Sequence, residues 1–367
     1  MQFRGLISLI AATALAYPAH PCAIFTLVED GEVFFGNNED YVLPGVVWFV
    51  PARKNRYGRV NVGFETDFAQ GSMNEAGLAF DSAALPEVHW ESDPDKETPN
   101  NLIERIMYEC ATVTEAIEFF ETYNCKHLRN AQFLFADATG DTAIVACLPD
   151  KGLDVRRIDG THTIATNTRL GMSGYRCPRW TKADQILSSG GGIKAVRNAL
   201  DAIHQEGAAS TTYSTIYDLK RKTVRIYNLA NFEDFVEFDL ETELEKGRQT
   251  IELGKLFASN RTLNDLMARA PRTYDTRITL DADHLATFAG RYRPDGATAV
   301  IRIAVDGPDL SWQVDDGAIV RLFPESSTTF RIAPDEGQVT FDIDDAGKVA
   351  GLTLHRGGDG YARRLPD

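Results

Sequence analysis

The sequence predicts an α+β protein of two domains, and three observations support this. The chain has 367 residues, which is more than one small domain usually holds. Strand-like and helix-like segments alternate from about residue 22 to 258, whereas short, regularly spaced strand-like segments take over from about residue 280. The composition, 43% hydrophobic and 25% charged, supports a sizeable core and excludes a disordered or fibrous chain.

The charge balance excludes some partners. Asp and Glu number 53 against 38 Lys and Arg, which gives a formal net charge of −15. Such a surface repels nucleic-acid phosphates and anionic lipid. No apolar run approaches the roughly 18 residues that a membrane span needs. We therefore expect a small-molecule substrate and neither a nucleic-acid partner nor a membrane span, and a homo-oligomer remains an open alternative.

The N-terminus is typical of an export signal. Arg4 supplies a positive region, Gly5–Ala16 is a short apolar segment, and Ala14–Ala16 is a small-x-small cleavage site. Residues 1–21 are therefore predicted to be a signal peptide plus the short propeptide Tyr17–Pro21, and the location to be periplasmic or secreted. The alternative is a buried N-terminal helix.

The cysteine count leaves one thiol over. The chain has an odd number of cysteines, namely Cys22, Cys110, Cys125, Cys147 and Cys177. At least one is therefore unpaired within the chain, and an unpaired thiol next to a processing site is a candidate for chemistry. Disulfides among the other four are possible, and the sequence does not choose between pairings.

The first part of the predicted N-terminal domain is rich in strands. The segments 23–28 and 33–35 are β-prone and flank Glu29–Glu32, whose Asp-Gly centre predicts a hairpin turn. Further strands are expected at 46–50, 60–64, 78–80, 131–136, 142–147, 212–219 and 223–229. Apolar residues at helical spacing predict helices at 100–110, 114–123, 179–187 and 193–204, and the stretch 245–275 has a helical, charged pattern.

The remainder of the chain changes character. From about residue 280, strand-like segments are separated by Gly and Asp turns, which predicts an all-β sheet or barrel. The predicted organisation is therefore residues 1–21 as signal peptide and propeptide, 22–258 as the main domain, 259–278 as a linker and 279–367 as a small all-β domain.

Cys22 is the candidate nucleophile of the sequence. If residues 1–21 are removed, its own α-amine lies beside its thiol. The amine has a pKa of about 7.7–8.0 and the thiol about 8.5, so proton transfer between them is nearly balanced at neutral pH. No separate histidine is then required. The alternative is that Cys22 is a small buried hydrophobe in an edge strand.

Several motifs carry a resemblance to a known family. The segment CAIFTLVEDGEVFFGNNEDY from Cys22, GSMNEAGLAFDSAALP from Gly71, Ala165–Asn167, Pro178–Ala183 and Thr212–Asp218 occur in the order found in the choloylglycine hydrolase and penicillin V acylase family of N-terminal-nucleophile (Ntn) cysteine hydrolases. The resemblance covers about residues 22–255. It implies a four-layer αββα sandwich, two antiparallel sheets between helices, and hydrolysis of linear amides without metal or other cofactor.

The resemblance also implies roles for single residues. Cys22 would be the nucleophile and, through its amine, the base. Asp40 would accept a hydrogen bond from the α-ammonium or the thiol, and Asn167 would donate its side-chain amide to the oxyanion. The alternatives are a turn-capping aspartate and a strand-end asparagine.

Two further positions complete the implied site, and one departs from the family. A backbone N–H near Ala84 would be the second oxyanion donor, and Arg179 would lower the pKa of the thiol, unless it is a surface arginine at a helix start. The family's arginine three residues before the aspartate is Asn37 here. Asn37 removes a cation that would favour the thiolate, although it could contact the N-terminal amine.

The implied function is an exported hydrolase that cleaves an N-acyl amide through a thioester on Cys22. Bile-salt, penicillin V and acyl-homoserine-lactone substrates are all of the family's kind. An acyltransferase of the same fold and a catalytically impaired exported binding protein are the alternatives. Five aromatic residues are candidate lining of an acyl pocket or plain core: Trp48, Phe49, Phe64, Phe80 and Trp90.

Overall fold

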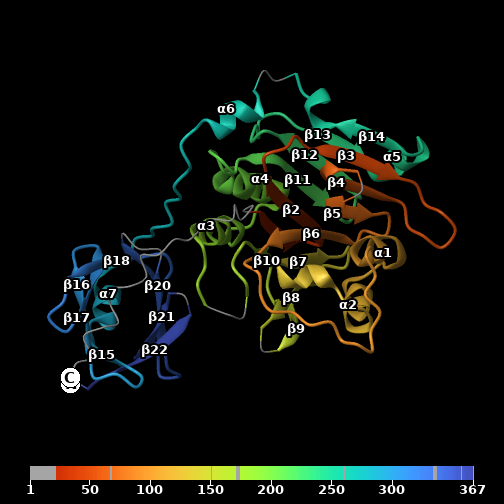
Figure 1. Cartoon of the computed structure of the whole chain (residues 1–367). Coiled ribbons are helices and arrows are strands. Elements are labelled where there is room, and N and C mark those ends of the chain that lie inside the picture. Colours follow the sequence, from red (N-terminus) through yellow and green to blue (C-terminus); the bar gives the residue numbers. More distant parts are fainter. Residues whose placement is uncertain are drawn as a thin grey trace.

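The computed structural model describes residues 22–66, 68–149, 151–170, 174–258, 261–333, 337–356 and 358–366. The predicted signal peptide and propeptide, residues 1–21, lie outside the described residues. Figure 1 shows a larger N-terminal unit of sheets and helices beside a smaller C-terminal unit made mainly of strands. The expectation of a mixed α/β protein with a small C-terminal all-β part is confirmed.

The first sheet of the N-terminal unit carries the start of the described chain. Its strands lie in the order β10-β1-β2-β11-β12-β13. The predicted hairpin is present, because Asp30 and Gly31 both adopt positive φ angles, 50° and 80°. The bounds are β1 Ala23–Glu29, β2 Glu32–Asp40, β10 His162–Ala165, β11 Thr211–Asp218, β12 Thr223–Asn228 and β13 Val236–Asp239.

The second sheet has the strand order β14-β3-β4-β5-β6-β7-β8-β9, and every neighbouring pair is antiparallel. The bounds are β3 Val46–Val50, β4 Arg59–Glu65, β5 Phe68–Asn74, β6 Ala79–Ala84, β7 Ala131–Ala136, β8 Thr142–Leu148, β9 Gly152–Arg157 and β14 Gln249–Glu252.

Alternation along the strands divides the core of the N-terminal unit into three clusters. One lies between the sheets and includes Cys22, Phe35 and Val60. A second joins the other face of the first sheet to the helices α3 (Pro178–Leu187) and α4 (Gly192–Ile203). The third joins the outer face of the second sheet to α1 (Leu102–Glu109), α2 (Val113–Thr122) and the 3-10 turn η1 (Lys126–Arg129).

The stretch 245–275 differs from its expected helical pattern. It contains the strand β14, which pairs with β3, between α5 (Leu240–Glu245) and the 3-10 turn η2 (Leu253–Lys255). The short helix α6 (Leu263–Met267) follows, and its Leu266 is buried in the α3–α4 cluster. Charged residues on the exposed face of an edge strand have no pattern that separates them from a surface helix, which explains the error.

The C-terminal unit is a closed eight-stranded barrel. Helix α7 (Ala282–Phe288) precedes it, and Leu285 and Phe288 pack into its apolar interior. Its strands are β15 Gly290–Pro294, β16 Ile301–Asp306, β17 Asp309–Val314, β18 Val320–Pro324, β19 Thr329–Ala333, β20 Gln338–Ile343, β21 Val349–His355 and β22 Asp359–Arg364.

The barrel contacts the chain segment that leads into α3. Arg331 donates to the carbonyl oxygen of Arg176 at 3.1 Å, and the backbone N–H of Arg176 donates to Gln338 at 3.1 Å. The N–H of Gly174 donates to Asp359 at 2.9 Å. The barrel therefore fixes the end of the connection between Asn167 and Arg179. Within the described part of the chain, every helix is too short or too polar to cross a bilayer.

Candidate active site

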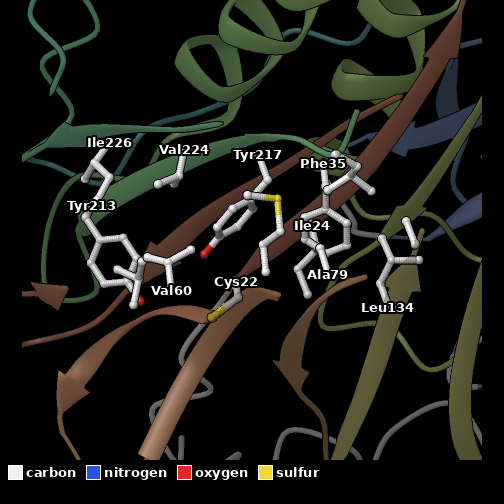
Figure 2. Close-up of a cluster of buried hydrophobic side chains, with 14 of the residues drawn as sticks. Cys22, Ile24, Phe35, Val60, Ala79, Leu134, Tyr213, Tyr217, Val224 and Ile226 are labelled. Carbon is white, nitrogen blue, oxygen red and sulfur yellow. The ribbon is translucent and has the colours of Figure 1, made fainter. Parts of the chain in front are cut away.

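Cys22 lies immediately before β1, and its side chain faces the second sheet. Its relative exposure is 3%, and it belongs to the cluster between the sheets (Figure 2). Its thiol donates a hydrogen bond to Oε1 of Glu39, with an Sγ–Oε1 distance of 3.2 Å. The resemblance expects Asp40 to accept a hydrogen bond from the α-ammonium or from the thiol. Here the carboxylate that accepts from the thiol is that of Glu39, and the contact of Asp40 with an α-ammonium stays a prediction.

The hairpin explains why Glu39 meets the thiol. The two-residue turn pairs Ala23 with Asn38 and Ile24 with Asn37, and the next rung of the ladder sets Cys22 opposite Glu39. Residues opposite each other in antiparallel strands project from the same face. The sequence reasoning missed Glu39, although the Asp30–Gly31 turn and simple counting along the two strands contain the signal.

The surroundings of Cys22 disfavour its thiolate. Burial raises the pKa of the Cys22 thiol well above its usual range, and the negative charges of Glu39, Asp40 and Asp81 raise it further, whereas a hydrogen bond from the backbone of Asp40 lowers it. Arg179, which the resemblance expects to lower the pKa of this thiol, forms an ion pair with Asp40, whose side chain lies on the opposite face of the sheet. Its effect on the thiol stays a prediction. In its present surroundings, the thiol needs a base to give up its proton.

Two carboxyl groups lie buried beside the thiol. Burial raises the pKa of Glu39 to about 8, while its hydrogen bonds from Cys22 and Asn37 act in the other direction. Burial and then the charge of Glu39 raise the pKa of Asp81 well above its usual range. Oδ2 of Asp81 and the hydroxyl of Tyr213 have no hydrogen-bond partner among the described residues. We call Cys22, Glu39 and Asp81 the thiol–carboxyl cluster.

Asp40 follows Glu39 in β2 and therefore points to the opposite face, toward the helices. Its carboxylate accepts hydrogen bonds from Arg179 at 3.2 Å, from Gln205 at 3.0 Å and from the hydroxyl of Thr211. Burial nevertheless raises the pKa of Asp40 to about 6, against the lowering effects of Arg179, Thr211 and Gln205. The carboxylate of Asp40 thus anchors the first sheet to α3.

Asn167 and Ala84 complete this connection. Nη2 of Arg179 donates to Oδ1 of Asn167 at 2.8 Å, and Nδ2 of Asn167 donates to the carbonyl oxygen of Ala84 at 2.7 Å. The resemblance expected the Asn167 amide to face an oxyanion, and here it joins the end of β10 to the end of β6. A continuous chain therefore runs from Asp40 through Arg179 and Asn167 to Ala84, so these predicted site residues are together.

Asn37 touches the thiol's partner. Its Nδ2 donates to Oε2 of Glu39 at 3.3 Å, and its Oδ1 accepts from the hydroxyl of Thr215 in β11. Where the family has a cation, this chain has a neutral amide that orients the carboxylate of Glu39. The departure noticed in the sequence therefore belongs to the same cluster as the acid that the sequence reasoning missed.

A cavity of about 400 Å³ opens at the thiol. Cys22, Glu39 and Ala84 contribute to its wall, together with Phe64, one of the predicted lining residues. Trp48 and Phe80 line a neighbouring cavity, whereas Phe49 is buried between the sheets and Trp90 lies at a different pocket. The Cys22 thiol is therefore reachable from this cavity although little of it is exposed.

We also searched the described residues for disulfides and for metal-binding groups. All five cysteines are free thiols, so none of the possible disulfides forms. Burial raises the pKa of the thiols of Cys110, Cys125 and Cys147. In the part of the chain that the structure describes, no group of three or more His, Cys, Asp or Glu side chains is arranged to hold a metal ion.

The comparison with protein families gives one match. Residues 29–177 match the model of a family described as acyl-coenzyme A:6-aminopenicillanic acid acyl-transferase. The match includes Glu39, Asp40, Asp81 and Asn167, and begins after Cys22. No curated protein sequence matches this chain.

Solved structures agree on the fold. Penicillin V acylase from Agrobacterium tumefaciens is similar with a TM-score of 0.53 and 17% identity, over 64% of this chain and 92% of that one. A variant of conjugated bile acid hydrolase from Clostridium perfringens has a TM-score of 0.50 and 16% identity, over 63% of this chain and 97% of that one. At such identities the likeness is one of fold. These comparisons confirm that this chain resembles the choloylglycine hydrolase and penicillin V acylase family.

Proposed function

We propose that this chain is an exported cysteine hydrolase that cleaves the linear amide bond of an N-acyl substrate through a thioester on Cys22. The arrangement of the two sheets and their covering helices fits the four-layer sandwich of Ntn hydrolases. The observation that carries the proposal is the buried Cys22 thiol, 3.2 Å from a carboxylate oxygen of Glu39 and at the wall of a cavity. Bile-salt, penicillin V and acyl-homoserine-lactone amides are candidate substrates.

The first half of the reaction forms the thioester. As the sulfur of Cys22 bonds to the amide carbonyl carbon, its proton passes to the carboxylate of Glu39, because the thiolate by itself is disfavoured. The negative charge that develops on the carbonyl oxygen needs hydrogen-bond donors. The candidates are the backbone N–H of Ala84 and the side-chain amide of Asn167, two residues in contact with each other. The carbon–nitrogen bond then breaks, and the leaving nitrogen takes up a proton.

The leaving group's proton has a candidate source in the chain itself. Removal of residues 1–21 would place the α-amine of Cys22 beside Glu39, Asp40 and Asp81, whose charges favour the ammonium form. That ammonium protonates the leaving nitrogen, and the amine so formed takes a proton from the attacking water in the second half. The C–S bond then breaks, the carboxylic acid departs, and Glu39 returns its proton to the sulfur.

This assignment differs from the sequence-based expectation that the α-amine removes the thiol proton. Both schemes require a mature N-terminus at Cys22, which intact-mass measurement of the exported protein tests. They differ in Glu39, which is needed only if the carboxylate is the thiol's base. Retained Tyr17 in a protein that is active on amides would contradict any role of the amine.

The central experiment screens the purified protein against N-acyl amides of these three types and searches for the acyl adduct by mass spectrometry. We expect hydrolysis, an acyl group on Cys22, and loss of both in Cys22→Ala and after alkylation of the thiol. Unchanged turnover by the alkylated protein would refute the proposal. An acyltransferase is the second candidate, favoured by the description of the matching family model; added amine acceptors would then yield new amides in place of free acid.

A further inference from the structure

A second cavity, of about 180 Å³, lies between the outer face of the second sheet and helix α1. Its walls are largely apolar and come from β3, β6, β7 and α1. We call it the α1 cavity. The apolar residues that line it include Trp48, Val50, Phe80, Ile103, Met107 and Phe133.

The α1 cavity adjoins the cavity at Cys22. Phe68, Ser82, His127 and Ala131 line both of them. Phe80, Ser82 and Ala84 alternate along β6 and therefore lie on one face of that strand. One strand face thus leads from Ala84, in the wall of the cavity at Cys22, to Phe80 in the α1 cavity. A chain attached to Cys22 through a thioester can extend along this face into the apolar space.

The far part of the α1 cavity carries arginines. Arg59 pairs with Val50 across the β3–β4 ladder. On the other side of β3, Gln249 pairs with Phe49, so Arg248 reaches the rung of Val50. The two arginines therefore flank Val50, and both line the cavity.

The positive charges of Arg59 and Arg248 at the α1 cavity outnumber the negative charge of Glu104, which also lines it. Arg59 is mostly buried and donates to Glu104 at 2.6 Å, which offsets one charge. Burial lowers the pKa of Arg59, and so do the charges of Arg248 and Arg56, whereas Glu104 raises it. Among the described residues no ion-pair or hydrogen-bond partner is found for Arg248, which is exposed. A positive charge in excess at an apolar cavity is notable in a chain of net charge −15.

We propose that the α1 cavity binds the distal part of the substrate's acyl group. This part is an aliphatic chain that ends in a carboxylate, and Arg248 binds that carboxylate. This inference rests on the proposed function, because it takes the bound molecule to be a substrate. The binding itself can be measured without catalysis. The apolar wall binds the methylene groups by burial. Arg248 and Arg59 supply donors to the terminal carboxylate.

The test uses the Cys22→Ala variant, in which turnover is excluded, and titrates it with pairs of aliphatic acids of equal length. Octanedioic and decanedioic acid represent the proposed acyl product, and octanoic and decanoic acid lack the distal carboxylate. We expect the diacids to bind roughly tenfold more tightly, since hydrogen bonds to charged groups contribute about 1.5–3 kcal/mol. The added substitution Arg248→Gln should abolish this preference.

Arg302→Gln is the matched control, because Arg302 is also an exposed arginine but lies in strand β16 of the barrel. It should leave the preference unchanged. Equal binding of mono- and diacids, or a preference that survives Arg248→Gln, would overturn the inference. Failure of the proposed function looks different: the active chain would then hydrolyse no amide, while the Arg248-dependent preference for diacids would persist in the binding measurement.

Discussion

Glu39 and Asp40 are neighbours in one strand, and their surroundings differ as much as two carboxylates can. Asp40 faces the helices, where Arg179, Gln205 and Thr211 donate to it. Glu39 faces the second sheet, where its charged surroundings are Asp81 and Asp40 and its hydrogen bonds come from a thiol and an amide. Asp40 has a cation partner, whereas Glu39 has the thiol of Cys22.

The difference separates a structural site from a chemical one. A buried carboxylate with a cation and two further donors holds elements together. A buried carboxylate without a cation keeps a high affinity for protons, and this makes it a proton acceptor near neutral pH. The pKa values follow this order, about 6 for Asp40 and about 8 for Glu39. The face of β2 that meets the Cys22 thiol is therefore the face whose carboxylate, that of Glu39, has no cation partner.

The largest expected effect is that of Glu39→Gln on turnover. The amide keeps the size of the side chain but cannot accept the thiol proton, so we expect kcat/KM for the amide substrate to fall about 1,000-fold, as for loss of a general base. Steady-state kinetics on the processed protein measures this. Glu65→Gln is the matched control, because Glu65 lines the same cavity and is exposed. Near-normal turnover in Glu39→Gln would return the role of base to the α-amine.

The paired side should respond mainly in stability. Arg179→Met leaves the carboxylate of Asp40 buried without its cation, and we expect the free energy of unfolding to drop by about 3 kcal/mol, as for a broken buried ion pair. Urea denaturation at pH 7.5 measures it. The double variant Asp40→Asn with Arg179→Met should recover most of the loss. If the double variant is as unstable as the single one, Asp40 is not the reason for the loss.

The third prediction concerns stability against pH. The pKa of Glu39 in the folded chain, about 8, exceeds its ordinary value of 4.5, so the folded state binds this proton more tightly. The resulting stabilisation is complete below pH 4.5 and is lost as pH rises through 8. Glu39→Gln lacks this loss. Its melting temperature relative to the unaltered chain should therefore rise between pH 5 and pH 8 and level off above that. A constant difference would show that the pKa of Glu39 is not raised in the folded state.

The smallest expected effect is that of Asp81→Asn on the pH–rate profile. Turnover that needs ionised Glu39 should rise with pH through about 8. Loss of the Asp81 charge makes ionisation of its neighbours easier, because Asp81 raises the pKa of Cys22. We expect the midpoint of the profile to move to lower pH by a fraction of a pH unit. A shift to higher pH, or none, would remove Asp81 from the thiol–carboxyl cluster.

Local patterns were sufficient for much of the fold. The helices and most strands of the N-terminal unit lie within a few residues of their predicted ranges, because apolar periodicity and the Asp30–Gly31 turn are properties of short segments. The all-β character of the C-terminal unit followed from its regularly spaced turns. Closure into a barrel could not follow, since it depends on β15 meeting β22, two strands far apart in the chain.

The sequence by itself determined a set of candidate residues for chemistry: a cysteine at a predicted processing site and, by family resemblance, Asp40, Asn167 and Arg179. Only the tertiary structure decided how they are used. Arg179 binds Asp40 on the face of the sheet that meets the helices, and Glu39 binds the thiol on the other face, because adjacent residues of a strand face opposite ways. The negative charge around Cys22 comes from β2 and β6, and no single segment of the chain contains it.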